Sequence, residues 1–431
     1  MQIIKNPKRE DWSRVLLRPN KDVAELTSNV KDILERVRIG GDTAVKEYEL
    51  LFDKVSLDAL QVTESEIEEA ESHIGEDLRR ALVLAHSNIA CFHEHQRFEC
   101  KEVFTQQGVR CWQKAVAIEK VGLYVPGGTA PLFSTVLMLA TPARIAGCKE
   151  IILCTPPNLN GKIHPAILVA AKIAGVKKIF KIGGVQAIGA MAYGTQSVPK
   201  VYKIFGPGNQ FVTAAKQQVS LRDVAIDMPA GPSEVAIVAD DTSNAEFVAA
   251  DLLSQAEHGA DSQSVVITTS ETIVHKVVNQ VESQVSKLSR KDLIDKSLEH
   301  CKIILMENMD DVMDIVNEYA PEHLILSVDN YMEYSERVVN AGSVFLGHYS
   351  CESAGDYASG TNHTLPTNGY AKAYSGVSLD SFIRKITFQE LTMEGVNSIG
   401  STVEIMAENE LLMAHKNAMS VRIAALRNIE F

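Results

Sequence analysis

The chain has 431 residues, of which 45% are hydrophobic and 23% are charged. This length exceeds what one hydrophobic core usually organises, so two substantial domains are expected, and the composition excludes disordered, collagen-like and disulfide-scaffold proteins. Lys and Arg number 42 against 55 Asp and Glu, which gives a net charge of −13. A negative net charge disfavours binding to the phosphate backbone, so nucleic acid is not expected as the main partner.

Seven cysteines are spread along the chain without a C-x-x-C pair. Their odd number and wide spacing argue against a disulfide framework and a thiolate zinc site, and favour a reducing compartment. The N-terminal segment has no long apolar run, and no stretch approaches the length of a membrane span. We therefore expect a cytoplasmic protein with no membrane partner.

The first part of the chain is predicted to be helical after an N-terminal extension at residues 1–21. From Asp22 to about Gln96 apolar residues recur at helical spacing, and Gly40-Gly41 predicts a helix end. Residues 109–121 are short and rich in β-formers, and they lead into an apolar strand at 121–128.

Strands and helices then alternate, which is typical of a parallel sheet covered by helices. One series runs from Tyr124 to Ser233, and a second begins at residues 234–238 and reaches residues 343–346. We expect an α/β fold with two Rossmann-like parallel-sheet domains. One is discontinuous and combines 22–123 with 235–376, and the other is inserted at 124–234.

The character of the sequence changes again after Phe345. Residues 348–376 are dense in Gly, Ser, Thr and Asn, and the segment is too long for an ordinary connection, so we expect it to be functional. Residues 377–431 form a tail whose last part is predicted to be helical, and it can dock on its own body or on another subunit.

Three glycine turns are candidates for binding phosphate. Gly127-Gly128, Gly183-Gly184 and Gly206-Pro207-Gly208 each follow a strand and precede a helix, where α/β proteins bind phosphate groups. None has the G-x-G-x-x-G pattern of a dinucleotide fingerprint, and each alone can equally be a plain strand-to-helix turn. Their common place on one sheet edge favours a cofactor site.

A second set of residues can bind a metal ion. Gln255 and His258 lie three apart at a predicted helix end, so an amide oxygen and an imidazole can reach one ion. Asp356, His363 and His415 offer a carboxylate and two further imidazoles, a donor set that suits zinc or manganese in a working site. The alternative is that these side chains make helix-end and turn hydrogen bonds or lie on a solvated face.

Glu322 and His323, in APEHL, place two acid/base groups side by side just before an apolar strand. If both point into one cleft, burial raises the pKa of the carboxyl group and suits it to act as a base. An exposed pair is the alternative. Cys148 and Cys154 lie among apolar neighbours that disfavour a thiolate, so we expect them to pack in the core rather than act as nucleophiles.

With these residues assembled, the sequence closely resembles the histidinol dehydrogenase family. The likeness runs from the N-terminal helices to the tail and includes VGLYVPGGTAPLFSTVLMLATPARIAGC, KIFGPGN, AIDMPAGPSEVAIVAD, LLSQAEHGADS, APEHL, ESAGDYASGTNHTLPT and AHKNA. It implies an NAD-dependent four-electron oxidation of L-histidinol to L-histidine through L-histidinaldehyde, with two NAD+ used in succession. These are the final steps of histidine biosynthesis.

The resemblance also implies roles for individual residues. One Zn2+ per subunit is implied, with the ligands Gln255, His258, Asp356 and His415. The implied catalytic pair is Glu322 and His323. Substrate contacts are implied for Ser233, Gln255, His258, His323, Asp356, His363, Glu410 and His415. In the inserted domain, NAD contacts are implied for Tyr124, Gln186 and Asn209.

A domain-swapped homodimer follows from the same resemblance, with the tail at 377–431 completing the active site of the partner. Glu410 and His415 are then expected to act in trans. We expect His323 to take the alcohol proton, Glu322 to activate water for hydration of the aldehyde, and zinc mainly to hold the substrate.

Two other functions stay open on the sequence. A metal-dependent hydrolase would hold a water molecule with the same ligands and use Glu322 as its base, without a nucleotide. A non-catalytic dimeric module would bind a small imidazole ligand in the α/β clefts. NADH formation from histidinol and NAD+ separates the dehydrogenase from both.

Overall fold

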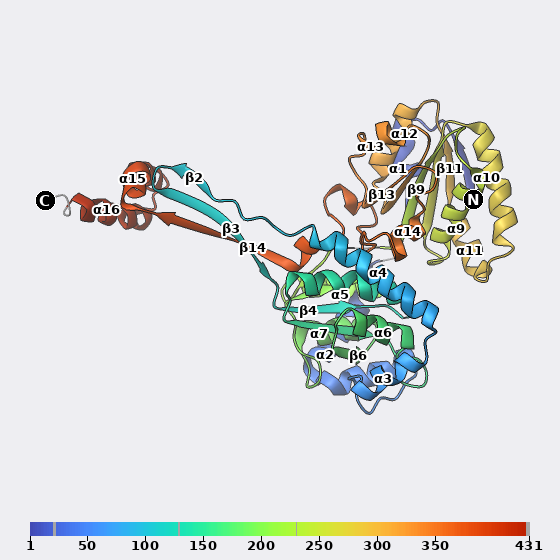
Figure 1. Cartoon of the computed structure of the whole chain (residues 1–431), viewed down its shortest axis with the longest axis horizontal. Helices are drawn as coiled ribbons and strands as arrows, with labels where there is room; N and C mark the ends of the chain where they lie inside the picture. Colours follow the sequence, from blue (N-terminus) through green and yellow to red (C-terminus); the bar gives the residue numbers. More distant parts are fainter. Residues whose placement is uncertain (20–22, 128–129, 230, 428–431) are drawn as a thin grey trace. The chain divides into compact units, whose positions relative to one another are not determined.

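The structure, a computed structural model, describes residues 1–19, 23–127, 130–229 and 231–427 (Figure 1). The chain forms two compact units. The first combines Met1–Gln96 with Ile118–Phe382, and the second combines Arg97–Ala117 with Ile383–Phe431. Gly128, which belongs to the first glycine turn, lies outside the described residues.

The first unit contains a five-stranded parallel sheet. Its strands lie in the order β6 (Lys178–Lys181), β5 (Glu150–Thr155), β4 (Lys120–Tyr124), β7 (Lys203–Phe205) and β8 (Ala225–Ile226). Counted along the chain from β4 this is the order 3-2-1-4-5 of a Rossmann-like sheet, with the switch point between β4 and β7. Four helices connect these strands, α5 (Phe133–Ala146), α6 (Pro165–Ile173), α7 (Gly184–Tyr193) and α8 (Gln210–Ser220).

Both faces of this sheet are buried, because successive strand residues point to opposite sides. Leu123 and Leu153 pack into one apolar cluster with α5 and α6, whereas Tyr124 and Ile152 pack into another with α7 and α8. The helices that precede the sheet, α2 (Val23–Tyr48), α3 (Glu64–Ser72) and α4 (Glu76–Glu94), complete the two layers. Within α2 the backbone leaves the helical conformation at Gly41, at φ 54°, where the sequence predicts a helix end.

Helices α2, α3 and α4 pack on the helices of a different sheet from the one that the sequence predicts. The sequence predicts that 22–123 joins 235–376, but α2 packs on α7 and α8, α3 packs on α6, and α4 packs on α5. The Val62 amide even donates to the Ile179 carbonyl of β6, at 2.8 Å. The apolar stripe of a helix shows that the helix is covered, and it does not show which of two sheets provides the cover. Helices α2, α3 and α4 therefore belong with the five-stranded sheet at residues 120–226.

A six-stranded parallel sheet forms the other part of the first unit. Its order is β1 (Gln2–Lys5), β11 (Lys302–Leu305), β10 (Gln263–Thr268), β9 (Glu234–Ala239), β12 (His323–Ser327) and β13 (Ser343–Leu346). From β9 onward the order is again 3-2-1-4-5, so the predicted α/β fold with two parallel sheets is confirmed. Residues 1–21, expected as an extension, contribute the edge strand β1 beside β11.

Helices cover both faces of the six-stranded sheet (Figure 1). One face packs against α9 (Ala245–Ala256), α10 (Glu271–Val285) and α11 (Lys291–Leu298), and the other against α12 (Met309–Tyr319) and α1 (Trp12–Val15), which follows a 3-10 turn at Arg9–Asp11. Two short helices, α13 (Tyr331–Ser335) and α14 (Glu352–Tyr357), flank β13 in the chain. The segment after α14 contains 3-10 turns at Tyr370–Lys372 and Leu379–Phe382.

The second unit is a three-stranded antiparallel sheet with two helices. The strands lie in the order β14 (Ile383–Leu391), β3 (Val109–Ala117) and β2 (Val103–Gln106), and α15 (Met393–Asn409) packs on α16 (Met413–Arg427). The sequence predicts the helices but not β14, because both faces of this strand are largely exposed and its apolar residues do not alternate. Among the described helices, none combines the length and the apolar character needed to cross a bilayer.

Candidate active site

Glu322 and His323 lie at the amino end of β12, in the interior of the first unit. His323 is the first residue of that strand and is level with Val235 of β9 and Ser343 of β13. Both side chains are buried, and His323 Nδ1 lies 3.7 Å from Glu322 Oε2. The Glu234 amide donates to Glu322 Oε2 at 2.9 Å, which fixes the carboxyl group beside the imidazole. The exposed alternative for this pair is therefore wrong.

Helix α9 brings Gln255 and His258 to the same edge of the sheet. In a parallel α/β unit each connecting helix runs against the strands, so its C-terminal end returns to the amino edge. Gln255 lies in the last turn of α9, and the His258 amide donates to the Gln255 carbonyl at 3.3 Å in the turn that follows. Gln255 is fully buried.

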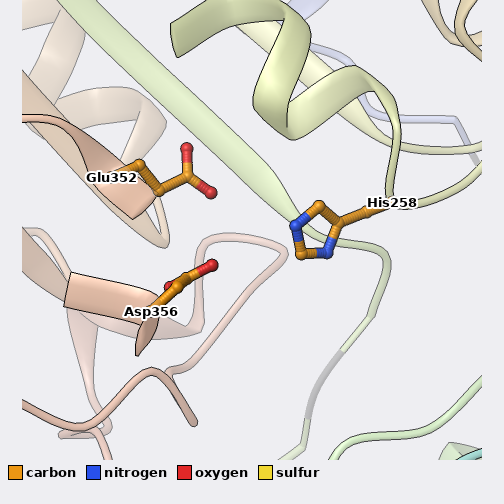
Figure 2. A group of neighbouring side chains, drawn as sticks. All are labelled: His258, Glu352 and Asp356. Atoms are coloured by element: carbon orange, nitrogen blue, oxygen red, sulfur yellow. The ribbon is translucent and has the colours of Figure 1, made fainter. Parts of the chain in front are cut away.

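Helix α14 supplies two carboxyl groups, Glu352 and Asp356. They are four residues apart and thus on one helix face. Figure 2 shows the His258 ring pointing toward both carboxyl groups, and ligand atoms of the three residues lie within 4.8 Å of one another. Such a carboxylate and imidazole cluster has the donor types that bind zinc.

The same carboxyl groups surround His323. Its Nδ1 lies 3.6 Å from Glu352 Oε1, and its Nε2 lies 3.5 Å from Asp356 Oδ1. Burial by itself lowers the pKa of the His323 imidazole. The carboxyl groups of Glu352, Glu322 and Asp356 outweigh burial and raise that pKa to about 10. Burial raises the pKa of Glu322 to about 8.

These residues fit a divalent cation. Both side-chain polar atoms of Gln255, both carboxyl oxygens of Glu352 and Oδ1 of Asp356 are buried without a hydrogen-bond partner. Buried polar atoms are nearly always paired, so an unpaired group of amide and carboxyl oxygens next to an imidazole fits a cation. These donor types suit zinc or manganese, and no cysteine is among them.

A second site lies at the carboxyl edge of the five-stranded sheet. A cavity of about 680 Å³ is lined by residues that follow three neighbouring strands, including Tyr124, Pro156 and Asn209, together with Gly184 and Gln186 at the start of α7. It lies at the switch point between β4 and β7, where open α/β sheets bind nucleotides. The three residues that the resemblance implies for NAD, Tyr124, Gln186 and Asn209, all line it.

Hydrogen bonds fix the walls of this cavity. The Gly184 amide donates to the Tyr124 hydroxyl at 3.1 Å, and Asn209 caps α8 by accepting from the Phe211 and Val212 amides. Gly206 has φ 129°, and a Cβ atom there would lie 2.0 Å from the Tyr124 carbonyl oxygen. The Gly-Pro-Gly turn is thus required by close approach of two strand ends.

Comparison with known proteins identifies the family. The family model of histidinol dehydrogenase matches residues 16–423. This chain belongs to the histidinol dehydrogenase family. Histidinol dehydrogenase from Bacteroides fragilis is 64% identical over 427 residues, covering 99% of this chain and 100% of that protein. The Yersinia pestis protein is 49% identical over 422 residues, covering 97% and 94%.

A solved structure of histidinol dehydrogenase agrees with the fold. The crystal structure from Elizabethkingia anophelis has a TM-score of 0.97 and 52% sequence identity, and the match covers 99% of each chain. As a histidinol dehydrogenase, the chain is an oxidoreductase of histidine biosynthesis that acts on histidinol.

Within the first unit, the candidate active site gathers most of the residues that the resemblance implies for substrate contact. Ser233 directly precedes β9, at the edge that carries His323. His363 follows α14, and burial lowers the pKa of its imidazole, although the nearby Asp356 carboxylate opposes this. Glu410 directly follows α15 and His415 lies in α16, both exposed and both in the second unit.

Sequence reasoning missed Glu352, which the structure places in the candidate active site. The signal was available, because Glu352 and Asp356 have the spacing of one helix face in ESAGDY. The expectation for the cysteines agrees with the structure. Cys154 is buried and Cys148 is half-buried, and burial raises the pKa of the Cys148 thiol to about 12.

Proposed function

We propose that the chain oxidises L-histidinol to L-histidine in a zinc- and NAD-dependent four-electron reaction, through L-histidinaldehyde and with two NAD+ per substrate. The observation that carries this proposal is the buried Glu322–His323 pair beside the unpaired donors of Gln255 and Asp356. An acid/base pair next to a cation site can both position a substrate and move its protons. The seven free thiols support a reducing, cytoplasmic location.

The proposed zinc ligands are Gln255, His258, Asp356 and His415, with Glu352 beside them. One Zn2+ held by these residues would act as a Lewis acid that mainly positions the substrate. Gln255 and Asp356 are held on two different helices, α9 and α14, so the first unit presents oxygen donors from two sides. Ser233 and His363 are proposed to contact the same substrate.

His323 is proposed to act as the base of the first half-reaction. It takes the hydroxyl proton of histidinol while the hydride leaves to NAD+, which yields the aldehyde, NADH and a proton. Glu322 then takes a proton from water, the resulting hydroxide adds to the aldehyde carbon, and the carbonyl oxygen takes the proton that His323 gained in the first step, so a gem-diol forms and His323 is a base again. His323 takes a hydroxyl proton of this diol as the second hydride leaves to another NAD+. No thiol is needed at any step.

The cavity at the carboxyl edge of the five-stranded sheet is the proposed NAD site. Tyr124, Gln186 and Asn209 line this cavity. The glycine turns beside it lack the G-x-G-x-x-G pattern of a tight phosphate-binding loop, so we propose that side chains hold much of the dinucleotide. Loose binding suits an enzyme that must exchange NADH for NAD+ while it keeps its aldehyde.

A homodimer is part of the proposal, with Glu410 and His415 acting in the site of the partner. The second unit exposes many large apolar side chains, including Phe104, Ile405, Met406, Leu411 and Met413. Exposed apolar groups of this kind mark a surface that another chain covers. The tail then completes a site that lacks one imidazole donor.

The variant Glu322→Gln tests the proposed division of roles. Removal of the base should lower the rate of NADH formation from L-histidinaldehyde about 100-fold. The rate of the first NADH formed from histidinol should fall much less, and stopped-flow absorbance measures both rates. The exposed Glu333 offers a matched control, because Glu333→Gln should leave both rates unchanged. Equal losses in both half-reactions would contradict the division, and no NADH from either substrate with the wild type would contradict the function.

A further inference from the structure

Glu49 is a fully buried carboxyl residue at the end of the N-terminal helices. It begins a π-helical turn, Glu49–Asp53, that directly follows α2. Single π-turns are rare and frequently lie at functional sites. A buried carboxyl group is costly unless it is bonded or neutral, so its partners show what it does.

One oxygen of Glu49 holds the wall of the dinucleotide cavity. Glu49 Oε1 accepts from the Gly183 amide at 3.0 Å and from Gln186 Nε2 at 2.9 Å. Gly183 and Gln186 belong to the turn that opens α7, in which Gly184 has φ 55° and donates to the Tyr124 hydroxyl. A residue from outside the sheet therefore fixes the conformation of this turn.

Asp53, the last residue of the same π-helical turn, lines the cavity itself. Among the described residues, Glu49 Oε2 is buried and has no hydrogen-bond partner. Burial is the main cause that raises the pKa of Glu49 to about 8; the nearby Asp53 carboxyl group adds to the rise, and the bonds from Gln186 and Gly183 oppose it. The role of Glu49 is therefore carried by Oε1 and its two partners.

The orientation of Gln186 follows from these bonds. Its amide nitrogen is engaged by Glu49, which leaves Oε1 as a buried acceptor without a partner in a residue that lines the cavity. An unpaired buried acceptor favours a ligand that brings an N–H or O–H donor, such as the carboxamide or ribose hydroxyl of a dinucleotide.

We propose that Glu49 is a positioning residue of the dinucleotide cavity, holding Gln186 and the Gly183–Gly184 turn with one carboxyl oxygen. This inference rests on the proposed NAD site. Glu49 itself does not touch the dinucleotide and acts through Gln186 and the turn.

The test compares variants by calorimetric titration with NAD+ and by steady-state KM values for both substrates. Glu49→Leu removes both contacts and should raise the dissociation constant of NAD+ about tenfold or more, with the KM for histidinol and the zinc content unchanged. Glu49→Gln keeps an oxygen acceptor for Gly183 and Gln186, so it should bind NAD+ within about threefold of the wild type. Glu47→Leu, at an exposed carboxylate on the preceding turn, is the matched control.

The outcomes separate this inference from the proposed function. If wild-type protein does not bind NAD+, the proposed function fails. If wild type binds and Glu49→Leu binds equally well, or shifts the KM for histidinol as much as that for NAD+, the positioning role is wrong. If Glu49→Leu does not fold, Glu49→Asp decides, because its shorter side chain cannot reach both partners, and NAD+ affinity at the wild-type level would overturn the role.

Discussion

At the scale of single residues, the charges around His323 support the proposed cation in the candidate active site. His323 lies within 3.7 Å of three carboxyl groups, and its raised pKa keeps the imidazole protonated and unable to accept a proton. A divalent cation bound beside Asp356 would offset these carboxylates and lower the pKa of His323 toward the range of a useful base. The acid/base role of His323 and the proposed metal site therefore depend on each other.

Glu49 gives a pH dependence to folding that one substitution should remove. Its folded pKa of about 8 lies above the ordinary 4.5, so the folded state binds the proton more tightly than the unfolded state does. The stability that this group contributes is complete below its unfolded pKa and is lost as the pH rises through its folded pKa. Glu49→Gln, which does not titrate, should therefore gain in melting temperature relative to wild type as the pH rises from about 5 to about 8. Thermal melts followed by circular dichroism measure this, and a constant difference across that range would contradict it.

At the scale of elements, the sequence predicts the strands and helices of both parallel sheets better than their assignment to layers. The strands starting at Lys120, Glu234 and His323 are short apolar runs between turn residues, the pattern of parallel strands buried on both faces. The layer that α2 covers depends on long-range packing that no local pattern contains. The strand β14 was missed because its sheet is exposed on both faces.

The candidate site shows the same limit of sequence reasoning. Residue types and their spacing in the sequence indicated Glu322, His323, Gln255 and His258 as candidates, and the resemblance implied their roles. Glu352 lay outside both, although its distance from Asp356 in α14 was a usable signal. Glu49 had no signal, because its partners are residues 183 and 186, and only the fold brings them to it.

The turn after β7 offers a prediction about an element. A Cβ atom at Gly206 would clash with the Tyr124 carbonyl, and the backbone there has positive φ. Gly206→Ala should destabilise the fold by about 1–3 kcal/mol and raise the KM for NAD+ more than that for histidinol. Gly75→Ala is the control, because no atom lies within 4 Å of the added group and φ is −71°. Equal stability of both variants in denaturant titrations would show that the turn tolerates the clash.

At the scale of the whole molecule, the proposed trans arrangement can be tested by mixing inactive subunits. Glu322→Gln removes a catalytic group that each chain contributes to its own site. His415→Ala removes a metal ligand that, in the proposal, each chain contributes to the site of its partner. If sites are shared, a heterodimer has one site with both lesions and one with neither, so an equal mixture refolded or coexpressed should recover about a quarter of wild-type activity. Recovery of no activity would show that each chain uses its own tail.

The most direct test of the account is the number of NADH molecules formed for each histidinol consumed, measured by absorbance and product analysis on protein of known zinc content. The account predicts two NADH per histidine formed, with activity lost on chelation and restored by zinc. One NADH per histidinol with accumulation of the aldehyde, or full activity of the metal-free protein, would contradict it.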